Sequence, residues 1–157
     1  MHKIIVRNAL FMAFLFVVVA VTISNAQLLV TNIEVESAPK DLAISPDGKI
    51  AYVVNVGSDT VSVIRIFEEG RLVNEVVETI SVGNQPHDVL FSQDGALAFV
   101  SNRGENTISV IDTSLSQVIE TLPAGDGPYG GAISPDGETI YFANGAGNSV
   151  SVIDTSN

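Results

Sequence analysis

The chain repeats one pattern of residues three times, and this repetition limits its possible folds more than any other feature. Each copy begins with a proline, continues through an Asp-Gly pair and an apolar run ending in asparagine, and closes on Ser-Val-Ile. The prolines, Pro39, Pro86 and Pro128, are 47 and 42 residues apart. A period of this length with several short apolar runs is typical of a β-propeller blade of four antiparallel strands. We therefore expect an all-β chain of about three blades, either a partial propeller or half of a six-bladed dimer.

Residues 1–26 have the three-part layout of a secretory signal peptide. The basic residues Lys3 and Arg7 precede an uncharged, mostly apolar run over 9–23, and small residues follow it. We expect a signal helix with cleavage after Ala26, and hence a secreted, periplasmic or cell-surface protein. The alternative is an uncleaved anchor as the only membrane attachment, although the run is shorter than the about 20 residues of a membrane span.

The rest of the chain is strongly acidic. Two of the seven basic residues and none of the 18 acidic ones lie in 1–26, so the remainder carries five basic and 18 acidic side chains, a net charge of −13. The negative electrostatic potential of such a chain repels nucleic acid, and we therefore exclude nucleic acid as a partner. Because the chain has no cysteine, it forms no disulfide and no thiolate metal site. We expect no cofactor.

Each repeat predicts the strands of one blade, named A to D from the inside outward. We expect a lone outer strand D in 27–36, blade units in 37–83 and 84–125, and a third unit in 126–157 without its own strand D. The apolar runs of strand B do not alternate, which indicates burial on both faces. The predicted strands are A over 42–45, 89–92 and 132–134; B over 50–54, 97–100 and 139–143; C over 61–64, 108–111 and 150–153; and D over 28–35, 73–82 and 117–122.

Two repeated polar positions have structural explanations. An Asp-Gly pair closes a turn, because Asp bonds a downstream amide and Gly adopts a positive φ. These aspartates lack the spaced oxygen ligands of a calcium loop. We expect the repeated asparagines to bond nearby backbone, and the strand C serines (Ser62, Ser109 and Ser151) to face outward. The structural positions are Asp47, Gly48, Asn55, Asp94, Gly95, Asn102, Asp136, Gly137 and Asn144.

Three blades would leave two apolar blade faces open, since propellers close with typically four to eight blades. One explanation is a fragment of a longer propeller, which the sequence favours because the third unit stops after strand C. The other is a head-to-tail pair of chains that forms six blades. The expected partners are accordingly a protein or cell-envelope component, or a second copy bound through the open faces.

The residues after each proline are the candidate ligand-binding positions, because strand A begins near the central channel of a propeller. These residues are Lys40, Asp41, His87, Asp88 and Tyr129. His87 is the only histidine after residue 26, and one histidine cannot build a zinc or copper centre. His87 and Asp88 could form half of a general-base arrangement. No nucleophile is placed beside them by sequence, so we assign no catalytic residue.

The units resemble the YVTN family of β-propeller repeats. Tyr52-Val-Val-Asn55 matches the motif for which that family is named, and 99–102 and 141–144 are variants of it. The resemblance covers residues 37–157. It implies a propeller similar to those of surface-layer and exported proteins, of seven-bladed lactonases, and of nitrous oxide reductase and cytochrome-d1-type proteins.

These observations favour an exported, non-catalytic propeller that acts as a binding or cell-surface structural module. The alternative is a fragment of a lactonase-like or other propeller enzyme that is active only in a full ring. A third possibility, implied only by the resemblance, is an accessory propeller of a redox system.

Overall fold

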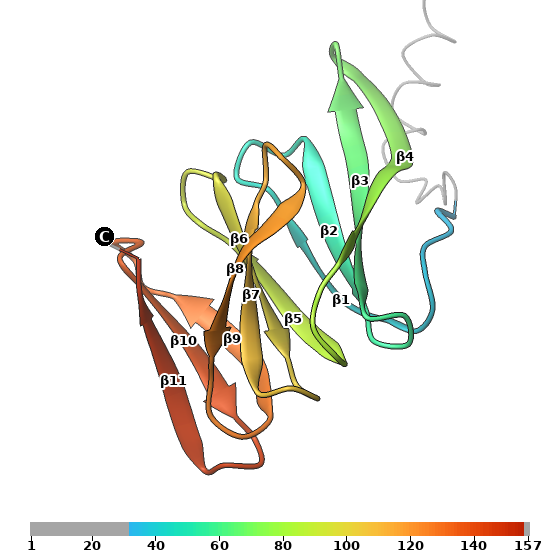
Figure 1. Cartoon of the computed structure of the whole chain (residues 1–157). Helices are drawn as coiled ribbons and strands as arrows, with labels where there is room; N and C mark the ends of the chain where they lie inside the picture. The colour runs from blue at the N-terminus through green and yellow to red at the C-terminus, as the bar shows by residue number, and fades with distance from the viewer. Residues whose placement is uncertain (1–31, 156–157) are drawn as a thin grey trace, which may run out of the picture. The chain divides into compact units, whose positions relative to one another are not determined.

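The computed structural model describes residues 32–155, which form three antiparallel sheets (Figure 1). Their strand orders are β1-β2-β3-β4, β5-β6-β7-β8 and β11-β10-β9, here called blades 1, 2 and 3. The all-β expectation is confirmed, and the third sheet lacks a fourth strand among the described residues. The strands are β1 (Pro39–Ile44), β2 (Ile50–Asn55), β3 (Thr60–Glu68), β4 (Arg71–Ser81), β5 (Pro86–Phe91), β6 (Leu97–Asn102), β7 (Thr107–Asp112), β8 (Gln117–Pro123), β9 (Pro128–Ile133), β10 (Thr139–Asn144) and β11 (Ser149–Asp154).

The strands differ from the predicted ones mainly at their ends. The first strand of each blade begins at the proline itself, three or four residues earlier than predicted. The extra residues of the first unit lengthen the β3–β4 hairpin, whose turn contains Glu69 (φ 49°) and Gly70 (φ 78°). Positive φ at both central residues suits the twist of a two-residue hairpin. The predicted signal segment, 1–26, lies outside the described residues.

Neighbouring blades pack face to face through apolar side chains. Between blades 1 and 2, Tyr52, Val61 and Val63 meet Val100 and Phe91, with the Tyr52 and Phe91 ring centroids 4.9 Å apart. Between blades 2 and 3, the cluster contains Phe99, Ile108, Val110, Ile140 and Phe142. Because β6 contributes to both clusters, it is covered on both faces. This arrangement explains why the central strands are continuously apolar.

The two end blades each have one face without a neighbouring blade among the described residues. On blade 1, Ala51, Val53 and Ile64 are buried beneath Ile33 and Val35. Residues 32–35, the described part of the predicted lone strand D, form no strand, and 28–31 lie outside the described residues. On blade 3, Tyr141, Val150 and Val152 remain exposed. Within the described residues, the end face of blade 1 is thus covered in part by Ile33 and Val35, whereas Tyr141, Val150 and Val152 of blade 3 are not covered.

The Asp-Gly turn takes the same form in all three blades. In blade 1, Oδ1 of Asp47 accepts hydrogen bonds from the Ser45 hydroxyl (2.7 Å) and the Lys49 amide (3.1 Å). Asp94 and Asp136 make the equivalent bonds, and the glycines that follow the three aspartates have φ between 73° and 81°. The predicted turn role of these residues is therefore what the structure shows.

The repeated asparagines bond side chains and not backbone, which corrects one expectation. The Asn102 amide donates to the hydroxyls of Thr107 (3.0 Å) and Ser109 (2.9 Å), and Asn55 makes the same pair of bonds to Thr60 and Ser62. Ser62 and Ser109 are consequently buried, so the prediction that they face outward is wrong. Both faces of β3 and β7 are covered, and a small hydroxyl is tolerated there because Asn satisfies it.

No helix long and apolar enough to cross a membrane occurs within residues 32–155.

Candidate functional site

The starts of the three first strands lie next to one another, since β5 contacts both β1 and β9. In each blade the first strand pairs with the second strand, and the register of this pairing shifts just after the proline. The shift lies between Pro39 and Asp41 in β1 and between Pro86 and Asp88 in β5. In blade 3 it is recorded on the second strand, between Phe142 and Asn144 of β10. Such bulges re-aim side chains and are over-represented next to active sites. They set the positions of the five candidate residues predicted from the sequence.

Asp41 and Asp88 form a carboxyl pair that links blades 1 and 2. Burial, followed by a hydrogen bond to the Asp41 side chain, raises the pKa of Asp88 to about 7. A hydrogen bond between two carboxyl groups requires a proton on one of them, so this pair holds a proton up to neutral pH. A carboxyl group that gains and loses its proton near pH 7 can act as a general acid or base.

A third blade contributes to the same pair through its backbone. The Gly131 amide donates a 2.6 Å hydrogen bond to Oδ2 of Asp88, while the Asp88 amide donates to the Ser101 hydroxyl (3.1 Å). That hydroxyl in turn donates to the Tyr129 carbonyl (2.7 Å). The buried Ser101 therefore fixes the separation of β5 and β9, and with it the position of the Asp88 side chain.

His87 and Tyr129 lie in direct contact beside this pair. Their ring centroids are 3.8 Å apart and the ring planes differ by 33°, with Tyr129 45% exposed. Burial lowers the pKa of His87, and the positive charges of Lys40 and Arg103 lower it further. The imidazole is thus neutral at pH 7, and two cationic side chains act on the same small region.

The structure brings all five predicted positions into one neighbourhood. Lys40 and Asp41 also line a hollow of about 240 Å³ on the open side of blade 1, together with Pro39, Leu42 and Val53. The sequence analysis missed Ser101 and Arg103. A signal for Ser101 existed, because it replaces the apolar Val54 and Ala143 of the other two units.

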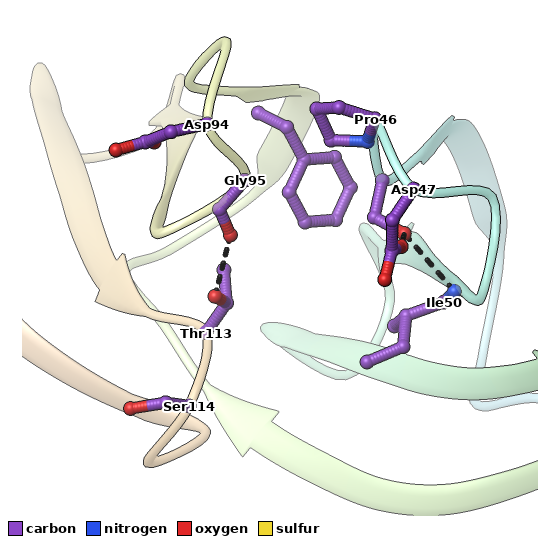
Figure 2. A pocket seen from close by; sticks show the side chains of 9 residues that line it. Pro46, Asp47, Ile50, Asp94, Gly95, Thr113 and Ser114 are labelled. Atoms are coloured by element: carbon purple, nitrogen blue, oxygen red, sulfur yellow. Dashed lines mark hydrogen bonds between the residues drawn. The ribbon is translucent and has the colours of Figure 1, made fainter.

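A second hollow, of about 260 Å³, lies at the opposite ends of the same strands, between the turns of blades 1 and 2 (Figure 2). Asp47 and Asp94 line it, together with Thr113, whose hydroxyl donates to the Gly95 carbonyl at 2.6 Å. Both carboxylates are held by the serine and amide bonds of their own turns, which lower their pKa values, that of Asp47 to about 2. They are fixed anions at neutral pH, so the hollow lacks a proton-transferring group.

Repeated four-stranded blades with polar groups gathered at the strand starts define the β-propeller class. The chain belongs to the lactonase family of seven-bladed β-propellers, which it matches over residues 26–157. No curated protein matches the chain.

Solved structures similar to this chain include enzymes of two kinds. Hydrazine synthase of Kuenenia stuttgartiensis is 31% identical with a TM-score of 0.70, over 83% of this chain and 36% of that one. A putative 6-phosphogluconolactonase of Bacteroides uniformis is 27% identical with a TM-score of 0.66, over 79% of this chain and 38% of that one. The periplasmic gluconolactonase PpgL of Pseudomonas aeruginosa is 26% identical with a TM-score of 0.61, over 74% of this chain and 35% of that one. The chain thus spans little more than one third of each of these chains.

The family assignment changes the balance between the functions expected from the sequence. The propeller fold is confirmed, and the family is that of the lactonases, so the lactonase-like alternative is better supported than the non-catalytic surface module. The finer resemblance to YVTN and surface-layer proteins receives no support from these matches.

Proposed function

We propose that this chain is the acid–base part of a lactonase-type propeller and that the protein opens the ring of a sugar-acid lactone. The observation that carries the proposal is the Asp41–Asp88 pair, where one carboxyl has a pKa of about 7 at the start of neighbouring strands. The lactonase family match and the similarity to two proteins described as gluconolactonases support the choice of a cyclic ester as substrate.

The reaction is the addition of water to the carbonyl of a cyclic ester. Ionised Asp88 accepts a proton from the attacking water, so that hydroxide character develops at the carbonyl carbon. The tetrahedral intermediate then collapses, the bond from carbon to the ring oxygen breaks, and the carboxyl returns the proton to that oxygen. A pKa near the operating pH serves both steps, because the group must accept and then donate the same proton.

The surrounding charges suit an anionic or polyhydroxylated lactone. Lys40 and Arg103 both act on His87, so their positive charges extend over the region of the carboxyl pair. The exposed Tyr129 ring and the neutral His87 offer a flat surface with polar edges. Positive charge in an otherwise acidic protein concentrates an anionic substrate at this one place.

Export is part of the proposal. The signal-like segment 1–26 and the similarity to a periplasmic gluconolactonase both support an enzyme that meets its substrate outside the cytoplasm. Cleavage after Ala26 would be seen as a secreted chain that begins at Gln27.

The test is hydrolysis of gluconolactone and 6-phosphogluconolactone, followed as acid release at constant pH and corrected for the uncatalysed rate. Asp88→Asn should lower kcat/KM by about 10²–10⁴-fold, the usual contribution of general acid–base catalysis. Glu138→Gln, which changes an exposed carboxyl in the blade 3 turn, is the matched control and should leave the rate unchanged. Hydrolysis no faster than the uncatalysed rate, or insensitive to Asp88→Asn, would contradict the proposal.

A further inference from the structure

One fully buried hydroxyl, that of Ser101 in β6, connects two blades beside the carboxyl pair. Its oxygen accepts a hydrogen bond from the Asp88 amide at 3.1 Å, and its proton is donated to the Tyr129 carbonyl at 2.7 Å. A serine hydroxyl carries a single proton. With an amide on one side and a carbonyl on the other, the direction of both bonds is fixed.

The other two units have apolar residues where blade 2 has Ser101. Ser101 pairs with Asp88 in the register of β5 and β6. In the same register of blade 1, Val54 pairs with Asp41, and blade 3 has Ala143 at this position. Val54 is itself fully buried, so the blade fold alone does not explain the hydroxyl of Ser101.

The bulge in β5 gives the hydroxyl a partner that an apolar residue could not serve. The register of β5 against β6 shifts between Pro86 and Asp88. A bulge disrupts the ladder locally, and a buried amide there needs another acceptor. The Ser101 oxygen accepts from the Asp88 amide. Because the same hydroxyl bonds the Tyr129 carbonyl, the bulge is held at one position relative to β9.

A second bond between β5 and β9 closes a circuit around Asp88. Gly131 lies two residues after Tyr129 in β9, and its amide donates to Oδ2 of Asp88 at 2.6 Å. Asp88 is therefore held at its main chain through Ser101 and at its side chain through Gly131. Hydrogen bonds at both ends of a residue limit its rotamers. The carboxyl consequently stays in reach of Asp41, whose side chain it bonds.

The same hydroxyl sets the contact between His87 and Tyr129. His87 precedes Asp88 in β5, and its ring centroid lies 3.8 Å from that of Tyr129. Ser101 bonds the main chain on both sides of this ring contact. A change in the separation of β5 and β9 would thus move the carboxyl and the two rings together. A displacement of about 1 Å in an active site can cost about 10²-fold in rate.

We infer that Ser101 is a positioning residue of the proposed reaction, whose hydroxyl holds the β5 bulge against β9 and thereby places the Asp88 carboxyl and the His87–Tyr129 ring pair. Ser101 acts through Asp88 and not on the substrate. The catalytic part of this inference rests on the proposed function. The positioning part concerns the Asp88 carboxyl itself and can be measured without a substrate.

The first test compares threonine and valine in place of Ser101, because these side chains have the same shape and differ in the hydroxyl. Ser101→Val carries the residue of blade 1, and Ser101→Ala carries that of blade 3. Both should lower kcat for gluconolactone by about 10–100-fold with little change in KM, whereas Ser101→Thr should retain most of the activity. Equal rates for the threonine and valine variants, or a parental rate for Ser101→Ala, would overturn the inference.

The second test follows the Asp88 carboxyl carbon by NMR as pH is varied. Burial is the largest cause of the raised pKa of Asp88, about 7. A carboxyl released from its place in Ser101→Val should therefore titrate at lower pH. The ionisable groups that act on Asp88 and on the adjacent His87 are unchanged in this variant; they are Lys40, Asp41 and Arg103.

This titration also separates the inference from the proposed function. A lower midpoint in Ser101→Val, in a chain that does not hydrolyse lactones, would support the positioning role and contradict only the proposed activity. An unchanged midpoint would overturn the positioning role.

Ser109→Ala is the matched control, because it removes another buried hydroxyl of blade 2. That hydroxyl bonds Asn102 and no group of the site. The variant should lose stability while its kcat and the Asp88 midpoint stay parental. In the parent chain the Asp88 amide should exchange slowly with solvent, because it donates to a buried hydroxyl. Exchange at the rate of an exposed amide, or equal midpoint shifts in Ser109→Ala and Ser101→Val, would contradict the inference.

Discussion

The amide of Gly131 donates a 2.6 Å hydrogen bond to Oδ2 of Asp88, 43 residues earlier in the chain. Because the Asp88 carboxyl also bonds the Asp41 side chain, one side chain of blade 2 is tied to both neighbouring blades. The group that titrates near neutrality is therefore also a connection between blades. Its protonation should affect stability as well as chemistry.

The free energy of unfolding of the parent chain should decrease as pH rises, and the substitution Asp88→Asn should abolish this decrease. The pKa of Asp88 is about 7 in the folded chain against an ordinary value of 3.8. Protonation therefore favours the folded state, an effect fully present below pH 4 and lost as pH rises through 7. The change is on the order of 1–2 kcal/mol after solvent screening of this half-buried group is allowed for.

Urea unfolding at pH 5 and pH 8 measures this difference. The turn carboxyls have lowered pKa values, so their contributions vary below pH 4 and do not enter this range. The pKa of His87 is lowered, so the contribution of His87 to the stability of the folded chain increases as pH rises towards 6.5. This contribution is opposite in sign to that of Asp88 and is the same in the parent chain and in Asp88→Asn. Identical pH profiles for the parent and Asp88→Asn would refute the assignment.

The His87 imidazole should titrate below pH 6.5. Burial disfavours its charged form, and the positive charge of Lys40 is the next largest cause. NMR of the imidazole protons gives the midpoint directly, and Lys40→Gln should move it upward. Lys49→Gln, in the turn at the other end of β1, is the control and should not move it. A midpoint at or above 6.5 would contradict the described packing.

Gly131→Ala should destabilise the fold, whereas Gly130→Ala should not. A Cβ at Gly131 would lie 2.7 Å from ring atoms of Phe142 and 2.8 Å from the Tyr141 carbonyl oxygen, while one at Gly130 meets nothing within 4 Å. Overpacking of this kind costs about 1–3 kcal/mol. The two neighbouring positions in β9 make a matched pair for thermal or urea unfolding. Equal stability of the two variants would be inconsistent with the packing of β9 on β10.

Asn102→Ala should cost more stability than Ser109→Ala. Loss of the Asn102 amide removes two hydrogen bonds and leaves the buried Ser109 hydroxyl without that donor, for a cost of about 2–3 kcal/mol. Ser109→Ala removes one bond, and Thr107 still accepts from the amide, so its cost should be about 1 kcal/mol. Urea unfolding compares them, and the reverse order would show that the serine has another buried partner.

Features confined to one repeat were predictable from the sequence. The turn at Asp47 depends on residues within two positions of it, and the apolar run of β2 indicates two-sided burial without knowledge of what covers it. The asparagine partners were mispredicted, although they lie in the same unit. In a buried strand pair the backbone of Asn102 already bonds across to Thr107, so its side chain turns to the hydroxyls beside it.

Features that join different repeats were not predictable. The sequence placed Asp41 and Asp88 at equivalent positions, but equivalence does not reveal that two carboxyl groups share a proton. The bulges that re-aim them follow from the register of β1 and β5 against their partners, which no local pattern specifies. Ser101 differs from its counterparts in the other units, and only the position of Tyr129 shows why a hydroxyl is useful there.

Each serine–aspartate turn is closed by side chains of its own unit, from Ser45 and Asp47 in the first blade to Ser134 and Asp136 in the third. A gene segment encoding one such unit can consequently be duplicated or deleted without breaking the hairpin geometry of the units that remain.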